Sequence, residues 1–109
     1  MIGLRRLSLY AASAGALLLT ASTAAAAPRE YVVVIDKMKF GPVVPILRKG
    51  DAIVWVNRDI FRHTATAANH SFDVDLPPGA KVRIVLTSTG SIPFLCRYHP
   101  GMRGVLEVK

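Results

Sequence analysis

The feature that most constrains the fold is a series of short β-type segments, which fills the chain after Ala27. β-Branched and aromatic residues gather in short runs at residues 31–35, 43–47, 52–56, 62–67, 81–87, 92–96 and 104–108. Turn signals separate these runs, and the strongest is Pro77-Pro78-Gly79. No stretch keeps a helical apolar period over ten residues. Seven or eight short strands at close spacing predict an antiparallel β-sandwich or barrel.

The first 26 residues are interpreted as an export signal rather than as part of this fold. Arg5 and Arg6 give a positive start, residues 7–19 form an apolar stretch, and residues 20–27 are small. This order is typical of a secretory signal peptide, and cleavage after Ala26 meets the small-residue requirement. We therefore predict a signal peptide at residues 1–26 and one domain at residues 27–109.

An uncleaved membrane anchor is the alternative interpretation of this segment. Alanine is only weakly apolar, and hydroxyl residues interrupt the stretch at Ser8, Ser13, Thr20, Ser22 and Thr23. The pair Arg5-Arg6 also resembles a twin-arginine signal weakly, so the export route stays open. We expect a periplasmic protein that is not inserted in the membrane once the signal is cleaved.

Charge and cysteine content exclude several classes of protein. Residues 27–109 hold 12 basic and 7 acidic side chains, a net charge of +5. The 109-residue chain is too short for a Rossmann or barrel enzyme. Its one cysteine, Cys96, rules out an internal disulfide, a Cys-x-x-Cys redox pair and any cluster that needs four thiolates. Because the periplasm is oxidising, a lone thiol there needs protection.

The most informative motif is Cys96-Arg97-Tyr98-His99-Pro100-Gly101-Met102. It offers a thiolate, an imidazole and a thioether at three-residue spacing. Soft sulfur ligands combined with imidazole favour copper, and a trigonal copper centre takes one Cys, two His and a weak axial Met. The motif therefore predicts a copper site that lacks one histidine.

Two histidines are candidates for the missing ligand, His63 and His70. His63 begins a β-type run, so the sheet would hold its side chain in place. His70 stands in a polar, turn-like segment and is interpreted as a solvated loop residue. We expect His63 to be the ligand.

Zinc binding and nucleophilic catalysis are alternative chemistries for the same residues. Zinc takes Cys and His, but a structural zinc site normally has a fourth strong donor, and Met is a poor zinc ligand. Nucleophilic catalysis by Cys96 with His99 would need a residue that orients the histidine, and the loop holds no Asn or Asp for this. Copper remains the better prediction.

At these residues the chain resembles the cupredoxin family of small blue copper proteins, most closely its plastocyanin and amicyanin branch. The resemblance covers nearly all of residues 27–109. The matching stretches are Met38-Lys39-Phe40-Gly41-Pro42, residues 49–59 followed by His63-Thr64, Ser71-Phe72-Asp73, Leu76-Pro77-Pro78-Gly79, and Cys96-x-x-His99-Pro100-x-Met102-x-Gly104-x-Leu106-x-Val108.

The resemblance implies an all-β, Greek-key sandwich of about eight strands that binds one copper ion cycling between Cu(II) and Cu(I). It implies the ligands His63, Cys96, His99 and Met102, with the short ligand loop typical of amicyanins. The chain departs from the family pattern beside the first ligand. Arg62 replaces a frequent proline, and Thr64 replaces a frequent asparagine whose hydrogen bonds a threonine hydroxyl could make in part.

The expected function is that of a monomeric electron carrier rather than an enzyme. The outer edge of His99 would be the electron port, and the basic surface would steer an acidic redox partner. Phe40, Phe61, Phe94, Pro100 and Met102 are candidates for the apolar shell, although Phe40, Phe94 and Trp55 suit the core better. The alternative functions are copper delivery or storage, copper enzymology and metal-free adhesion. Nucleic-acid binding is not expected, because basic and aromatic residues do not cluster.

Overall fold

The computed structural model describes residue 3, residues 13–20 and residues 27–109. The predicted signal peptide, residues 1–26, lies mostly outside the described residues. In the described parts of the chain, no helix has the length and apolar character needed to cross a membrane.

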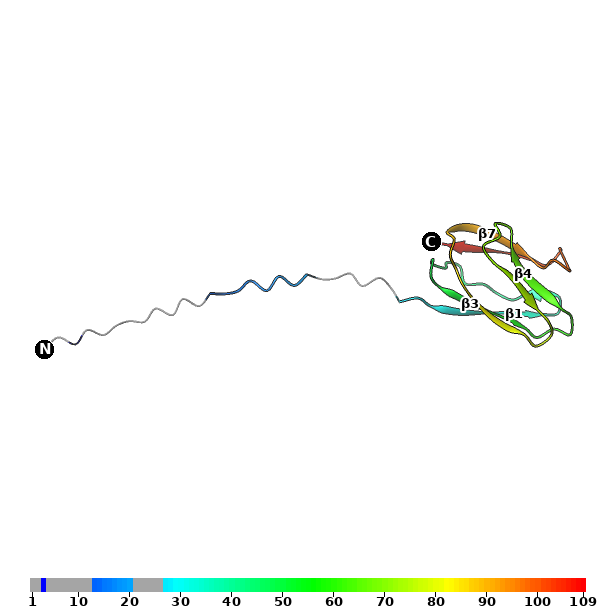
Figure 1. Ribbon diagram of the computed structural model, residues 1–109, viewed down its shortest axis with the longest axis horizontal. Coiled ribbons are helices and arrows are strands. Elements are labelled where there is room, and N and C mark those ends of the chain that lie inside the picture. The colour runs from blue at the N-terminus through cyan, green and yellow to red at the C-terminus, as the bar shows by residue number, and fades with distance from the viewer. Residues whose placement is uncertain (1–2, 4–12, 21–26) are drawn as a thin grey trace.

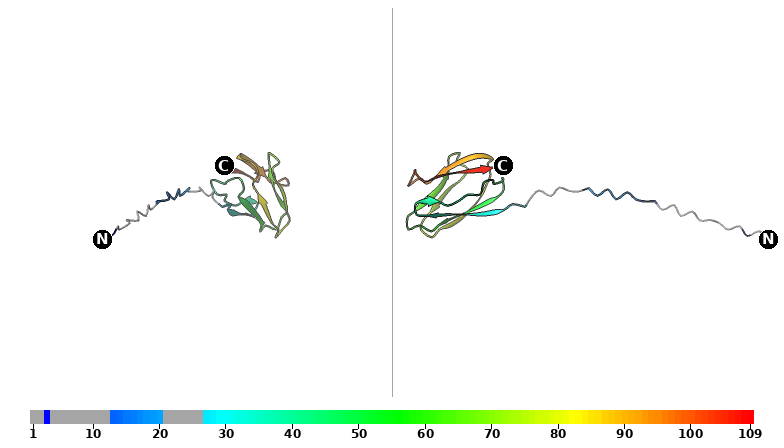
Figure 2. Two further views of the ribbon diagram at one scale, coloured as in Figure 1. Left: turned by 60° about the vertical axis from the view of Figure 1, so that its left-hand side comes forward. Right: turned by 180° about the vertical axis from the view of Figure 1, so that it is seen from behind.

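Eight strands form two four-stranded sheets, which face one another in Figures 1 and 2. One sheet has the order β2-β1-β3-β6 and the other the order β5-β4-β7-β8. This confirms the predicted all-β sandwich of about eight strands. The strands are β1 (Glu30–Asp36), β2 (Lys39–Phe40), β3 (Ala52–Asn57), β4 (His63–Ala67), β5 (Asp73–Leu76), β6 (Lys81–Val85), β7 (Gly90–Leu95) and β8 (Arg103–Val108).

The prediction that all strands pair antiparallel is wrong at one place. β1 and β3 pair in parallel, with Val33 opposite Trp55. The chain between them first forms the short antiparallel pair of β1 with β2 and then returns to the start of the sheet before β3 begins. A parallel neighbour needs such a crossover connection, whereas a hairpin does not.

The strand predicted at residues 43–47 is also wrong. Only Leu47 makes an isolated parallel bridge, to Val108. Pro45 lies inside this segment, and proline has no N–H to donate to a sheet. The segment instead runs along the edge of β8, where the Leu47 N–H donates to the carbonyl oxygen of Glu107 at 2.8 Å.

β2 and β5 are short strands that the run-based prediction did not include. β2 forms because Lys37 and Met38 make a two-residue turn in which both have positive φ, 50° and 60°. Such a turn matches the twist of a hairpin but is usually made by Asn-Gly. β5 follows another tight turn, in which His70 has a φ of 61°.

Aromatic rings fill the centre of the sandwich. Trp55 is fully buried, and its ring centroid lies 6.0 Å from Phe40, 5.8 Å from Phe72 and 5.2 Å from Phe94. Phe94 covers Gly104 on the neighbouring strand, where a Cβ would overlap the ring. These contacts confirm that Trp55, Phe40 and Phe94 pack in the core.

The fold brings two distant segments together at one end of the sandwich. β4 begins at His63 and pairs with β7, with Thr66 opposite Leu95. β7 is followed by the loop at residues 96–102, after which β8 begins. The loop between β7 and β8 therefore lies beside the start of β4, although 33 residues separate His63 from Cys96.

Candidate metal centre

Three predicted donor residues meet in one cluster, His63, Cys96 and His99. The Cys96 Sγ lies 3.8 Å from the Nδ1 of His63 and 3.6 Å from the Nδ1 of His99. One donor atom from each residue lies within 4.8 Å of the others. His63 and Cys96 are fully buried, whereas His99 is half-buried. The predicted convergence of these three residues is confirmed.

Backbone hydrogen bonds hold the loop between β7 and β8 in a compact conformation. The His99 N–H donates to the carbonyl of Cys96 at 3.2 Å, and the Met102 N–H donates to the carbonyl of His99 at 2.8 Å. The Cys96 N–H donates back to the carbonyl of Met102 at 3.1 Å and closes the loop. Two successive turns thus convert the three-residue spacing into a compact cradle, with Met102 buried at its end.

The Cys96 sulfur accepts a hydrogen bond from the backbone. The N–H of Thr64 donates to Sγ at 3.3 Å. A donor aimed at a sulfur ligand fixes its position and tunes the potential of a metal held there.

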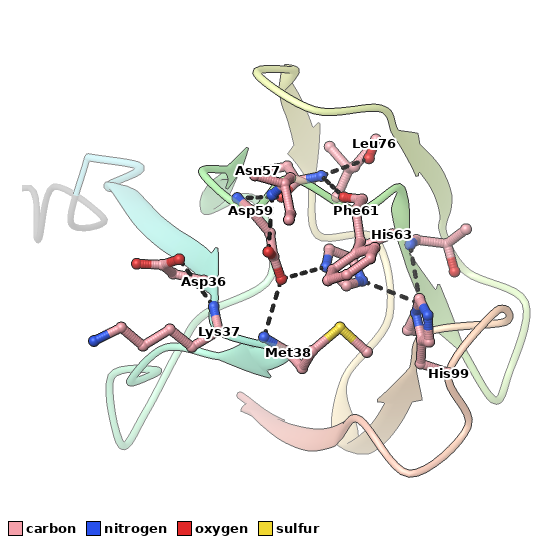
Figure 3. A network of polar contacts seen from close by, with 12 residues as sticks. Asp36, Lys37, Met38, Asn57, Asp59, Phe61, His63, Leu76 and His99 are labelled. Atoms are coloured by element: carbon pink, nitrogen blue, oxygen red, sulfur yellow. Dashed lines mark hydrogen bonds and ion pairs between the residues drawn. The ribbon is translucent and has the colours of Figure 1, made fainter.

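The hydrogen bond between His63 and Asp59 orients the imidazole. The Nε2 of His63 lies 2.9 Å from the Oδ2 of Asp59 (Figure 3). Because a carboxylate only accepts hydrogen bonds, Nε2 is the donor, and Nδ1 is the ring nitrogen that faces the Cys96 sulfur. This is the arrangement that metal-ligating histidines commonly show.

Asp59 is itself fixed by its surroundings. The N–H of Met38 donates to Oδ2 at 3.0 Å, and the N–H of Ile60 donates to Oδ1 at 2.8 Å. The hydrogen bonds from His63 and Met38 hold the pKa of Asp59 below its usual range, although burial opposes this effect. The β1–β2 turn and the loop before β4 thus converge on the ring of His63 (Figure 3).

Asn57 is fully buried and organises the same loop. Its Nδ2 donates to the carbonyl oxygens of Phe61 at 2.7 Å and of Leu76 at 2.8 Å. Its Oδ1 accepts the N–H of Asp59 at 2.9 Å. These contacts, drawn in Figure 3, fix the path of the chain from the end of β3 to His63.

Asp59 and Asn57 have no role that was predicted from the sequence. One signal could have found Asp59, because it is the acidic residue nearest in sequence to His63 and ligating histidines often pair with a carboxylate. His70, the rejected candidate, is exposed in its turn and is not part of the cluster. This agrees with its prediction as a solvated loop residue.

An exposed aromatic side chain, Phe61, lies beside His99. The ring of Phe61 lies 6.4 Å from that of His99, edge to face, and is 49% exposed. Ile60 and Tyr98 are also exposed at 81% and 50%. Of the residues proposed for an apolar shell, Phe61 therefore contacts the site from outside rather than from the core.

Arg62, which departs from the family pattern, points into solvent. Its guanidinium pairs with the carboxylate of Asp75 and lies 5.9 Å from the ring of Tyr98. The pair is about half exposed, so its net contribution to stability is small.

Comparison with known proteins gives a consistent result. A family model described as a cupredoxin-like domain matches residues 9–108. The amicyanin of Paracoccus versutus is 29% identical over 93 residues, covering 79% of this chain and 70% of the amicyanin. A solved structure of an amicyanin mutant, in its reduced Cu(I) form at pH 4, has a TM-score of 0.60 at 28% identity, covering 72% of this chain and 80% of that one.

A larger protein shares the same fold over part of its length. The Cu-containing nitrite reductase from Thermus scotoductus has a TM-score of 0.63 at 27% identity, and the match covers 76% of this chain but 22% of that enzyme. Its likeness therefore concerns one part of a longer chain. The donor set and the amicyanin relatives together support a single type 1 copper site.

Proposed function

Because the chain belongs to the cupredoxin-like family, we propose that it is a periplasmic electron carrier with one type 1 copper ion. When bound, copper would supply the redox couple, gaining and losing one electron between Cu(II) and Cu(I). The observation that carries the proposal is the position of the Cys96 sulfur, which faces the Nδ1 atoms of both His63 and His99.

The proposed ligands are His63 Nδ1, Cys96 Sγ, His99 Nδ1 and the thioether of Met102. The first three donors already face one another. Met102 is 6% exposed and closes the ligand loop, so its thioether would be available as a further, weak ligand. Three of the four residues lie on one hydrogen-bonded loop and the fourth lies on a strand, so little ligand movement would accompany a change of oxidation state.

The burial of the site favours electron transfer over copper delivery or storage. A protein that hands on its metal needs exposed, exchangeable ligands. Here His63 and Cys96 have no exposed surface, and Asp59 fixes the ring of His63 from behind. His99, which is only half-buried, would be the ligand through which a partner exchanges electrons with the site.

A docking surface for redox partners is proposed at His99. Phe61 lies against the ring of His99, and Tyr98 and Pro100 are the exposed neighbours of His99 in the loop. Ile60, which precedes Phe61 in sequence, is also exposed. Weak redox encounters use small interfaces of this kind. A basic side chain lies beside this surface, because the Nε of Arg103 donates to the carbonyl oxygen of Pro100 at 2.8 Å. Arg103 is exposed and forms no ion pair with any residue that the structure describes. We therefore propose a monomer that docks on acidic partners, as the net charge of +5 for residues 27–109 also favours.

The proposed location rests on residues 1–26, which have the order of a secretory signal. Amino-terminal sequencing of the exported protein should begin at Ala27. A protein that keeps residues 1–26 in the membrane fraction would contradict this part of the proposal.

The visible spectrum of the copper-loaded protein tests the central proposal. We expect an intense blue or green thiolate-to-copper band, which Cys96→Ser and His63→Ala abolish. The matched control is His70→Ala, which removes an exposed histidine and should leave the band intact. Voltammetry should then show one reversible electron per protein.

Two results would overturn the proposal. One is a protein that binds copper without a thiolate band. The other is a coloured protein from which a chelator removes copper as fast as an added reductant reduces it. This result would favour copper delivery.

A further inference from the structure

A closed ring of hydrogen bonds lies on the outer face of β4, behind the Cys96 sulfur. The backbone N–H of Arg97 donates to the Oγ1 of Thr64 at 2.8 Å. Thr64 Oγ1 lies 3.0 Å from Thr66 Oγ1, which donates to the Oδ1 of Asp73 at 2.8 Å. The side-chain Nε of Arg97 donates to the same carboxylate oxygen at 3.2 Å and closes the ring.

The strand register explains why these residues meet. Thr64 and Thr66 are two residues apart on β4, so they share the face opposite to His63. Asp73 stands directly across from Thr66 on β5. Directly opposed side chains are the closest cross-strand neighbours, and opposed polar residues hydrogen-bond readily.

The direction of every hydrogen bond in the ring follows from its ends. The carboxylate of Asp73 can only accept, so the single hydroxyl proton of Thr66 points to it. Thr66 Oγ1 must then accept from Thr64, whose oxygen accepts the N–H of Arg97. All donors thus point along one path from the ligand loop to Asp73, an arrangement in which each bond strengthens the next.

Thr64 links this ring to the metal centre. It is fully buried, its side chain holds Arg97, and its own backbone N–H donates to the Cys96 sulfur. Since Arg97 directly follows Cys96, the hydrogen bonds of the ring also hold the ligand loop in place immediately after Cys96. We propose that Thr66 and Asp73 are positioning residues, which keep the Thr64 hydroxyl directed at the Arg97 amide and so fix the Cys96 sulfur against β4.

The alternative is that Asp73 and Thr66 form ordinary surface contacts. Exposed ion pairs such as Arg97 with Asp73 contribute little by themselves. The chain offers a matched control on the same sheet, because the hydroxyl of Ser91 donates to the carboxylate of Glu107 at 2.8 Å. This control is also an exposed hydroxyl–carboxylate bond between neighbouring strands, but among the described residues no other side-chain hydrogen bond joins Ser91 or Glu107 to the ligand loop.

Hydrogen exchange of the Arg97 amide tests the ring without any metal. In the metal-free protein, Thr66→Val and Asp73→Ala should each speed this exchange about fivefold, because the hydrogen bond that holds the amide is weakened. Thr66→Ser keeps the hydroxyl and should restore the wild-type rate. Ser91→Ala should leave the Arg97 amide unchanged.

The copper-loaded protein tests the effect on the sulfur, and this part rests on the proposed function. Thr66→Val should move the thiolate-to-copper band and release copper roughly tenfold faster, while Thr66→Ser and Ser91→Ala keep the wild-type spectrum. The proposal is wrong if Thr66→Val leaves the Arg97 exchange unchanged, or if the exchange rises while band and release rate stay constant. If the wild-type protein itself shows no band, the proposed function fails, and the exchange experiment still decides whether Thr66 holds the loop.

Discussion

At the scale of single residues, Asp59 explains how a histidine becomes a ready ligand. Its carboxylate accepts the Nε2–H of His63 and also the N–H of Met38, so one acidic side chain fixes the orientation of the ring. A carboxylate behind a metal-ligating ring commonly strengthens metal binding. We therefore expect Asp59 to strengthen copper binding although it is not itself a proposed ligand.

Replacing Asp59 tests this role. We expect Asp59→Asn to weaken copper binding about tenfold or more, because a neutral amide supports the imidazole less and its NH₂ cannot accept a backbone N–H. Competition with a chelator of known affinity measures the change. Asp36→Asn is the control, since Asp36 also accepts a neighbouring backbone N–H but in an exposed turn. Equal affinities for the two variants would contradict the role of Asp59.

The sequence predicted the donor residues because they carry rare chemistry at regular spacing. Cys96, His99 and Met102 stand three residues apart, and His63 begins a recognisable strand. Asp59 and Asp73 could not be predicted in the same way, because acidic residues are common on surfaces. Their importance depends on which strands are neighbours, and this becomes known only from the fold.

At the scale of elements, the β7–β8 hairpin carries the ligand loop and its packing fixes the loop's ends. Phe94 on β7 lies directly across from Gly104 on β8, and its ring occupies the space where a side chain at 104 would stand. The glycine thus lets an aromatic ring of the core reach across the hairpin, two residues after Met102.

Two glycines at this end of the molecule should respond differently to alanine. Gly104→Ala should lower the free energy of unfolding by about 1–3 kcal/mol, because the added methyl group overlaps the ring of Phe94. Gly101→Ala adds its methyl group where no atom lies within 4 Å and should change stability by less than about 0.5 kcal/mol. Denaturant unfolding of the metal-free variants measures both. Similar losses in the two would show that the ring of Phe94 is not the cause.

Strands were predictable where apolar residues were frequent and were missed where topology decides. β3 stands out because most of its residues are β-branched or aromatic, and β7 because Ile92, Phe94 and Leu95 gather in it. β5 alternates between exposed and buried residues, but its two exposed positions are aspartates, which are uncommon in strands. The parallel pairing of β1 with β3 depends on the crossover between them, and no local pattern encodes it.

At the scale of the whole molecule, Asp51 ties the start of the domain to the turn before β3. The N–H groups of Arg29 and Arg48 donate to its two carboxylate oxygens, each at 2.9 Å. The backbone hydrogen bond from Arg29 is the largest cause that holds the pKa of Asp51 below its usual 3.8, while burial opposes it. Folding therefore favours the ionised form of this side chain.

This pKa shift predicts how stability depends on pH. The unfolded chain binds a proton on Asp51 more readily than the folded chain, so stability from Asp51 is fully present above pH 3.8. It is lost as the pH falls through the lower pKa of the folded protein. Urea unfolding should show that Asp51→Asn is less stable than wild type near neutral pH, and that the difference shrinks as the pH falls below 3.8 towards the lower pKa of the folded protein. A difference that stays constant with pH would contradict the prediction.

The complete enclosure of Cys96 has a consequence for experiments on this chain. It is the single cysteine, and none of its surface reaches solvent. An alkylating reagent can attack it only when the loop at residues 96–102 swings open or the protein unfolds. The rate of labelling therefore measures how often the loop opens or the protein unfolds. The native thiol reports this motion without an introduced cysteine.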